Sequence, residues 1–70
     1  MKAYQKRLIK ERNKLNKKLR KLVDFLESEE FTELPEETSL LLVTQSTIMA
    51  SYVNILNTRI YKEGIEDERE

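Results

Sequence analysis

Seventy residues make one small domain, a size at which a lone hydrophobic core is marginal and stability usually needs disulfides, a metal or oligomerisation. Cysteine and histidine are both absent, which excludes a disulfide framework, a thiolate or imidazole metal site, and the usual Cys/His or Ser/His nucleophile pairs. Oligomerisation therefore remains as the expected means of stabilisation, and the 13 basic and 13 acidic residues give a net charge of zero.

The charges are sorted along the chain, which the net value hides. Residues 1–21 hold ten Lys and Arg residues against one acid, a net charge of +9. Residues 22–37 hold seven acids and no base. The basic segment has three interpretations: a solvated helix face, a nucleic-acid surface, or a site for a small anion. The acidic segment and the scarcity of aromatic residues argue against nucleic acid.

The first predicted helix covers about residues 3–27. Its apolar residues recur at steps of three or four, with one gap at Glu11 and Arg12. Polar residues in such a gap fix the helix register, line a site, or belong to a solvated turn. One edge of this helix carries an aromatic ring among charged groups, and we expect it to bind a small anionic ligand. The residues concerned are Tyr4, Arg7, Lys10, Glu11 and Lys14.

A corner is predicted over residues 28–35. Ser28 suits the N-cap of a short helical turn that has Glu29 and Glu30 in its first turn. Pro35 suits the first turn of the next helix, where its missing N–H costs nothing. Connections of this length leave helices as antiparallel neighbours, so the sequence predicts an all-α hairpin.

The second predicted helix covers about residues 36–62 and contains 21 successive residues without charge, 38–58. Because a helix exposed to water keeps charged residues on its outer side, we expect burial on more than one side, which one short chain cannot supply. We therefore predict a homo-oligomeric helix bundle. Ten of the 21 residues are Thr, Ser, Gln or Asn, which argues against a membrane span.

Three apolar lines run along this helix and predict contacts with both the first helix and another copy. A polar line at spacings of seven, Gln45, Tyr52 and Arg59, lies beside them. This line either specifies the interface or forms the wall of a polar pocket, and we count its members among the ligand-binding residues. The predicted oligomer interface comprises Leu41, Leu42, Gln45, Ile48, Met49, Tyr52, Val53 and Leu56.

The hairpin domain is predicted to cover residues 1–63 and to be followed by an acidic, frayed tail at 64–70, with Gly64 ending the helix. No leader-like apolar segment follows the basic N-terminus, so we expect the protein in the cytoplasm, the host cell cytosol. No constellation indicates catalysis, a metal or a cofactor, and we expect no enzyme activity.

Several residue patterns resemble a group of small phage and prophage proteins, known mainly from a crAss-like phage gene product. The distinctive matches are Tyr4, Gln5 and Arg7 at the start, and the Leu-Pro-Glu-Glu corner at residues 34–37. The resemblance spans residues 4–60. The present sequence departs from that group by its Ser, Thr and Leu residues across 38–47, where relatives are more charged.

Thr38, Ser39 and Leu40, with Met49 downstream, are similar to the helical hairpin of the phage nucleotide sponges, the anti-CBASS and anti-Thoeris proteins. The sponge pattern has an aromatic residue beside its Met, whereas Ala50 stands here and Tyr52 comes later. The resemblance implies a phage counter-defence protein that holds a cyclic oligonucleotide or cyclic ADP-ribose-type messenger between subunits without cleaving it. The alternative is an oligomeric protein–protein interaction module that inhibits or bridges a host or phage protein.

Overall fold

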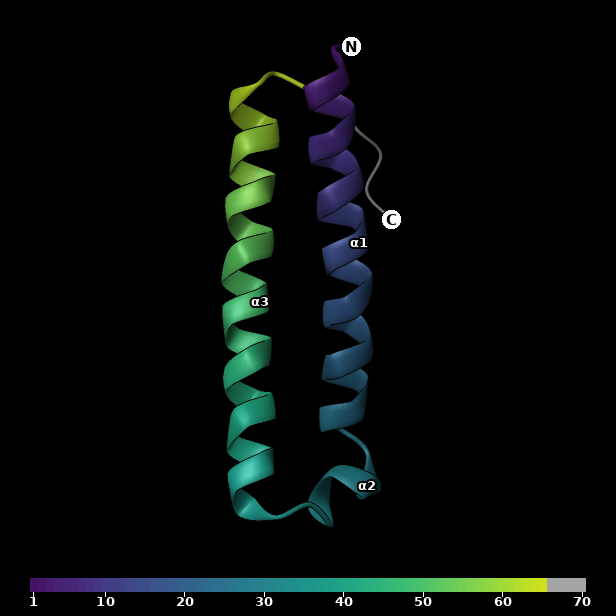
Figure 1. Cartoon of the computed structure of the whole chain (residues 1–70), viewed down its shortest axis with the longest axis vertical. Coiled ribbons are helices and arrows are strands. Elements are labelled where there is room, and N and C mark those ends of the chain that lie inside the picture. Colours follow the sequence, from purple (N-terminus) through teal and green to yellow (C-terminus); the bar gives the residue numbers. More distant parts are fainter. Residues whose placement is uncertain (66–70) are drawn as a thin grey trace.

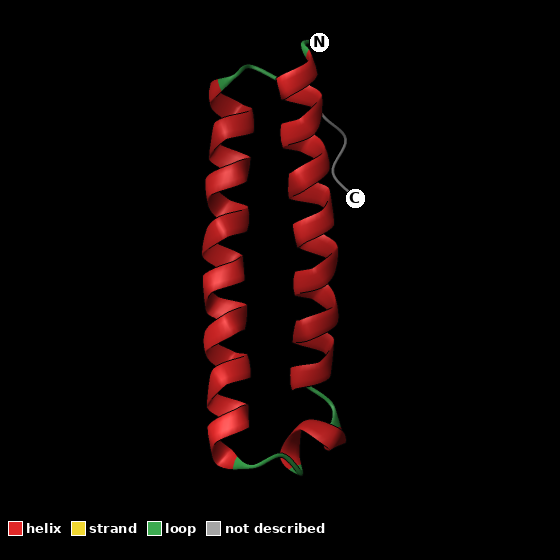
Figure 2. Cartoon of the chain, in the orientation of Figure 1, coloured by secondary structure: helices red, strands yellow, loops and turns green. Residues whose placement is uncertain are grey.

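The computed structural model describes residues 1–65 and contains three helices in this range. These are α1 (Ala3–Leu26), the short α2 (Glu29–Thr32) and α3 (Glu36–Lys62). The two long helices run antiparallel side by side, and α2 lies at the corner that joins them (Figure 1). Figure 2 shows the same arrangement by secondary structure, with only short loops between the helices. The all-helical prediction is confirmed for the described residues.

Helix α1 is held at its start by a side chain. Lys2 is the N-cap, and its backbone N–H donates to Gln5 Oε1 at 2.9 Å, which satisfies one of the amides that a helix start leaves without a partner. The helix ends one residue earlier than predicted, at Leu26, and Glu27 is its C-cap.

The corner is closed by Ser28 and by two aromatic rings. Ser28 Oγ accepts from the backbone N–H of Phe31 at 3.3 Å and donates to the carbonyl of Phe25 at 2.6 Å. The predicted Ser28 cap is therefore confirmed. Phe25 and Phe31 meet edge to face with ring centroids 6.2 Å apart. Pro35 was predicted in the first turn of the second helix, but it is the N-cap of α3. Glu36 and Glu37 are in the first turn.

The C-terminal end of α3 is fixed by a glycine in the left-handed region. Gly64 has φ 66°. Its N–H donates to the carbonyl of Tyr61 at 3.0 Å, and the N–H of Ile65 donates to the carbonyl of Ile60 at 3.3 Å. These two bonds form a Schellman motif. The first two residues of the predicted frayed tail therefore cap the helix, and residues 66–70 lie outside the described residues.

The core is confined to one end of the helix pair. Leu8, Leu56 and Ile60 are buried together, with Ile9, Leu15 and Ile65 packed against them. Farther toward the corner, the inward-facing leucines of α1 are only half-buried. The pair buries a complete core near its termini and an incomplete one near the corner.

Residues predicted for contacts between copies fall into two groups. Val53 and Leu56 are buried between α1 and α3, and Leu42 and Met49 are half-buried. A contact between copies would therefore use the exposed members, Leu41, Gln45, Ile48 and Tyr52.

Arg12 fills the gap in the apolar pattern of α1. It is 3% exposed, and its guanidinium donates to Asn57 Oδ1 of α3 at 2.7 Å and to Asn13 Oδ1 at 2.8 Å. The solvated-turn interpretation is therefore wrong for Arg12, because a buried guanidinium needs such acceptors.

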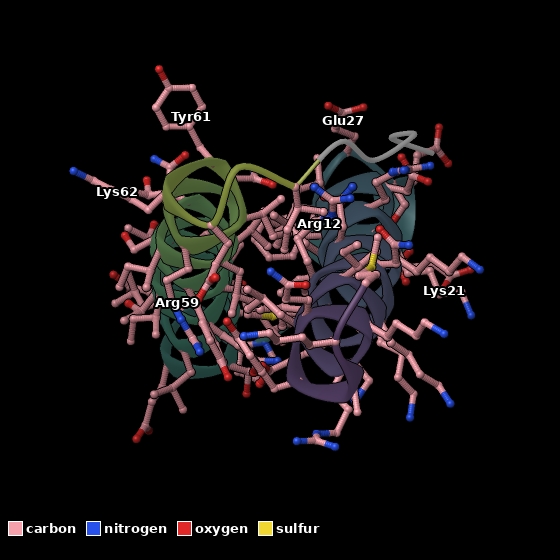
Figure 3. All side chains as sticks on the ribbon, turned by 90° about the horizontal axis from the view of Figure 1, so that it is seen from above. Arg12, Lys21, Glu27, Arg59, Tyr61 and Lys62 are labelled. Atoms are coloured by element: carbon pink, nitrogen blue, oxygen red, sulfur yellow. The ribbon has the colours of Figure 1, made fainter. Side chains whose placement is uncertain are left out.

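Figure 3 looks along the helices and shows Lys21 of α1 and Lys62 of α3 pointing to opposite outer sides of the pair.

The molecule is long and thin, with extents of 46 × 17 × 15 Å and a radius of gyration of 14.8 Å. A compact domain of 70 residues would have a radius of gyration of about 11 Å.

By length and composition, α3 is also the one helix within residues 1–65 that could cross a membrane.

Replacing Gly64 with Ala should lower the free energy of unfolding by about 1 kcal/mol, because an L side chain is disfavoured at this φ. A Cβ at this position would meet no atom within 4 Å, so the loss comes from the backbone conformation alone. Denaturant unfolding measures it. Gly64→Asn is the control, since Asn tolerates the left-handed region, and an equal loss in both variants would contradict this explanation.

Replacing Asn57 with Ala should lower the free energy of unfolding by about 2 kcal/mol, because it removes an acceptor from a buried charged donor. The matched control is Asn54→Ala, whose side chain is exposed on the same helix. Thermal and denaturant unfolding of both variants would decide the matter. Equal stabilities would show that the Arg12–Asn57 bond contributes nothing beyond a surface contact.

Candidate anion-binding groove

An open groove of about 820 Å³ runs along one edge of the helix pair. Most of its lining comes from α1, and α3 contributes Tyr52 and Arg59. The lining residues are Tyr4, Arg7, Leu8, Lys10, Glu11, Lys14, Leu15, Lys18, Tyr52 and Arg59. Its volume falls within the range of small-molecule sites, about 300 to 1,000 Å³.

The periodicity of α1 explains why the cations gather on this edge. Arg7, Lys14 and Lys18 are seven and four residues apart, so they lie on one side of the helix. With Lys10 and Arg59, the groove holds five cations against the single carboxylate of Glu11. Its walls therefore carry a strong positive potential in a protein whose net charge is zero.

Two tyrosines mark the groove, and each donates a hydrogen bond to a carboxylate across the helix pair, Tyr52 to Glu11 of α1 and Tyr4 to Glu63, the C-cap of α3. The Tyr52 hydroxyl donates to Glu11 Oε2, which joins α3 to α1 at the middle of the groove. The Tyr4 hydroxyl donates to Glu63 Oε2 at 2.9 Å, and Gln5 Nε2 donates to the same oxygen at 3.4 Å. Both rings are thus positioned by the fold, which lowers the cost of stacking a planar group on them.

The same contacts perturb both phenols. Hydrogen bonding to Glu11, with smaller effects from desolvation and the carboxylate charge, raises the pKa of Tyr52, and nearby Arg59 partly opposes this rise. Hydrogen bonding to Glu63 likewise raises the pKa of Tyr4. Both phenols therefore stay protonated, and act as donors, to higher pH than a free tyrosine would.

Seven of the eight residues predicted to bind a ligand line this groove. They are Tyr4, Arg7, Lys10, Glu11, Lys14, Tyr52 and Arg59. Gln45 lies outside it, exposed on α3, with its amide nitrogen 3.9 Å from Met49 Sδ. Lys18, Leu8 and Leu15 also line the groove and were not among the predicted residues. Lys18 could have been predicted, because it is four residues after Lys14 and so lies on the same side of the helix.

Neighbouring residues Glu11 and Arg12 serve opposite edges of the pair. Successive residues of a helix are about 100° apart, so Glu11 reaches Tyr52 in the groove while Arg12 reaches Asn57 away from it.

Within residues 1–65, no group of three or more His, Cys, Asp or Glu side chains could hold a metal ion.

The groove thus offers cations for phosphates, rings for a planar group, and one carboxylate that accepts from hydroxyl or amino groups. Comparison with family models places residues 2–62 in the family described as Sequestin. The chain belongs to the Sequestin family. That family name indicates sequestration of a ligand, and so binding rather than catalysis. Comparisons with curated proteins and with solved structures give no match.

Replacing Glu11 with Gln should lower the pKa of Tyr52 toward its ordinary value of about 10, because the neutral amide accepts a weaker bond and carries no charge. In a Tyr4→Phe/Tyr61→Phe background, Tyr52 is the remaining tyrosine, and ultraviolet absorbance follows its ionisation directly.

The sign of the stability effect follows from the raised pKa of Tyr52. Stability from its bond to Glu11 is complete below the ordinary pKa of the phenol and is lost as pH rises through the raised value. An unchanged titration midpoint after Glu11→Gln would show that the bond does not persist in solution.

Proposed function

We propose that this Sequestin protein is a phage counter-defence protein that sequesters a cyclic nucleotide-type immune messenger, between its own copies and without cleaving it. The observation that carries the proposal is the joint presence in one groove of five cations and two tyrosines whose hydroxyls are hydrogen-bonded to carboxylates. The family supports sequestration in general. The resemblance to phage sponges supplies the messenger class, and the host cytosol is the expected location.

The cations favour a ligand with more than one phosphate. Arg7 and Lys18 are eleven residues apart, about 16 Å along the helix, and Lys10 and Lys14 lie between them. One phosphate cannot contact all four cations over that length. Arg7 provides a planar, bidentate donor, whereas the lysines supply mobile point charges that adapt to the phosphate positions.

The carboxylate of Glu11 indicates what else the ligand carries. It sits among the cations and would repel a phosphate placed beside it. A ribose hydroxyl or an amino group on a base would instead donate to its oxygens, one of which already accepts from Tyr52. A polyphosphate without such donors fits the groove less well than a nucleotide.

Each tyrosine has a separate place in this arrangement. Tyr52 lies at the middle of the groove beside Glu11, and Tyr4 lies near its end beside Glu63. Either ring offers a face for a base, and the stacking of a base on an aromatic side chain contributes about 1–3 kcal/mol. Arg59 is the remaining cation of α3 in the groove and is placed to contact a polar edge of the ligand.

A protein–protein interaction module is the second candidate, because the chain has a dipolar surface, basic over residues 1–21 and acidic over residues 22–37, that could contact a charged protein. That function requires a protein partner that dissociates with added salt and no effect of small ligands on thermal stability. Calorimetry on the full chain with cyclic dinucleotides, cyclic trinucleotides and cyclic ADP-ribose isomers separates the two candidates. Absence of binding to every one of these compounds would remove the messenger proposal.

Lys14→Ala should weaken binding of a messenger about tenfold or more, because it removes one charge-assisted phosphate contact. Lys21→Ala is the matched control, since Lys21 has the same chemistry on the same helix but points away from α3 (Figure 3). Calorimetry at two salt concentrations should also show affinity falling with salt. Equal losses in both variants would mean that the basic helix acts only through its overall charge.

A further inference from the structure

We propose that two copies of this chain pair through α3 in an antiparallel, two-fold arrangement centred on Ile48, and that each copy thereby places Glu37 at the partner's groove. The pairing itself stands on the shape and surface of the chain. What it implies for ligand binding rests on the proposed function.

The first observation is a stripe of residues along the outer side of α3, which we name the α3 stripe. It consists of Glu37, Leu41, Ile48, Ile55 and Arg59. Their spacings of four, seven, seven and four bring them onto one side of the helix. All five are exposed in the single chain, and Ile48 at the centre is 63% exposed.

The stripe is symmetric in its spacing about Ile48 and carries opposite charges at its two ends. Leu41 and Ile55 each stand seven residues from Ile48, and Glu37 and Arg59 each stand eleven residues from it. A two-fold axis through Ile48 would therefore place Leu41 on the partner's Ile55 and Arg59 on the partner's Glu37. A self-complementary patch of this kind is what a two-fold interface requires.

The charges at the two ends select the direction of pairing. A parallel pair would set like charges against each other at both ends of the stripe, which disfavours that arrangement. The antiparallel pair instead forms two equivalent Glu–Arg contacts. Both arrangements bury the same apolar centre, so the charges alone decide between them.

The apolar residues of the stripe are well exposed in the single chain. Leu41, Ile48 and Ile55 are 64%, 63% and 58% exposed. A second copy that covers them would remove this apolar surface from water, which stabilises the pair.

The pairing would change the groove as well as the stripe. Arg59 belongs to both, and Tyr52 lines the groove beside the stripe. Within one chain, Glu37 is 22 residues from Arg59, about 33 Å along α3. Glu37 can therefore reach the groove only as the partner subunit's Glu37, where it would orient the Arg59 guanidinium at the rim.

Cross-linking tests the direction of pairing, because the chain has no cysteine of its own. Ile48→Cys should form a disulfide-linked dimer under mild oxidation. Leu41→Cys and Ile55→Cys should cross-link to each other when mixed, with one chain carrying a mass tag, and each should cross-link poorly alone. Asn54→Cys, exposed away from the stripe, is the background control. If Leu41→Cys cross-linked to a second Leu41→Cys chain as efficiently as to Ile55→Cys, the antiparallel pairing would be overturned.

Sedimentation tests whether the pair exists without any cross-link. Ile48→Asp should sediment as a monomer at concentrations where the unaltered chain is a dimer. Val43→Asp should remain dimeric, since Val43 is exposed on the other side of α3. Circular dichroism checks that both variants keep their helices. An unaltered chain that is monomeric throughout, or that is recovered with lipid vesicles rather than as a dimer, would overturn the proposal.

Glu37 and its neighbour Glu36 provide the matched pair for the groove. Both are in the first turn of α3 and so interact equally with the helix dipole, but only Glu37 is on the stripe. Glu37→Lys should weaken dimerisation about tenfold or more and change messenger affinity, whereas Glu36→Lys should do neither. A dimer that binds no messenger would remove the proposed function alone. A monomer that binds it fully would remove the pairing alone.

Discussion

Two helices side by side can bury only one side of each, and α3 is apolar on two sides. Its inner side packs against α1 through the cluster of Leu8, Leu56 and Ile60. Its outer side, with Leu41, Ile48 and Ile55, has no counterpart within residues 1–65. The hydrophobic effect scales with apolar area removed from water, so much of the stabilisation available to α3 requires a second surface. The slender shape, the incomplete core near the corner and the large exposed area are consequences of this one constraint.

The polar contacts between the helices fix their register where the core is thin. Apolar contacts are non-directional and tolerate sliding of one helix along another. Arg12 with Asn57 on one edge, and Glu11 with Tyr52 on the other, are specific and allow a single register. The second of these contacts lies inside the groove. The feature that aligns the helices therefore also places a carboxylate and an aromatic ring among the cations.

The helices, the Ser28 cap and the Gly64 helix end were predictable, because each depends on local sequence. The groove was largely predictable for α1, since charges at helical spacing must share a side. Which side of α3 faces α1 was harder, because three neighbouring apolar lines carry similar residues. Leu56 is buried and Ile55 beside it is exposed, and nothing in their side chains distinguishes them. The burial of Arg12 was also uncertain, since its acceptor Asn57 is 45 residues away in sequence.

Under the proposed function, a groove that sequesters its ligand without cleaving it must hold that ligand tightly, and this task would be divided between hydrogen-bonded tyrosines and longer, exposed lysines. Tyr4 and Tyr52 each donate a hydrogen bond to a carboxylate across the helix pair, which reduces the rotamer freedom that is lost when a ring stacks on a ligand. The side chains of Lys10, Lys14 and Lys18 are long and exposed, so they lose more rotamer freedom on binding than the tyrosines do. On that proposal, the hydrogen-bonded tyrosines would favour a ligand with a planar base, while the lysines would accept phosphates in more than one arrangement. Selectivity among phosphate-bearing ligands should therefore reside in the tyrosines and Glu11, and general affinity for anions in the lysines.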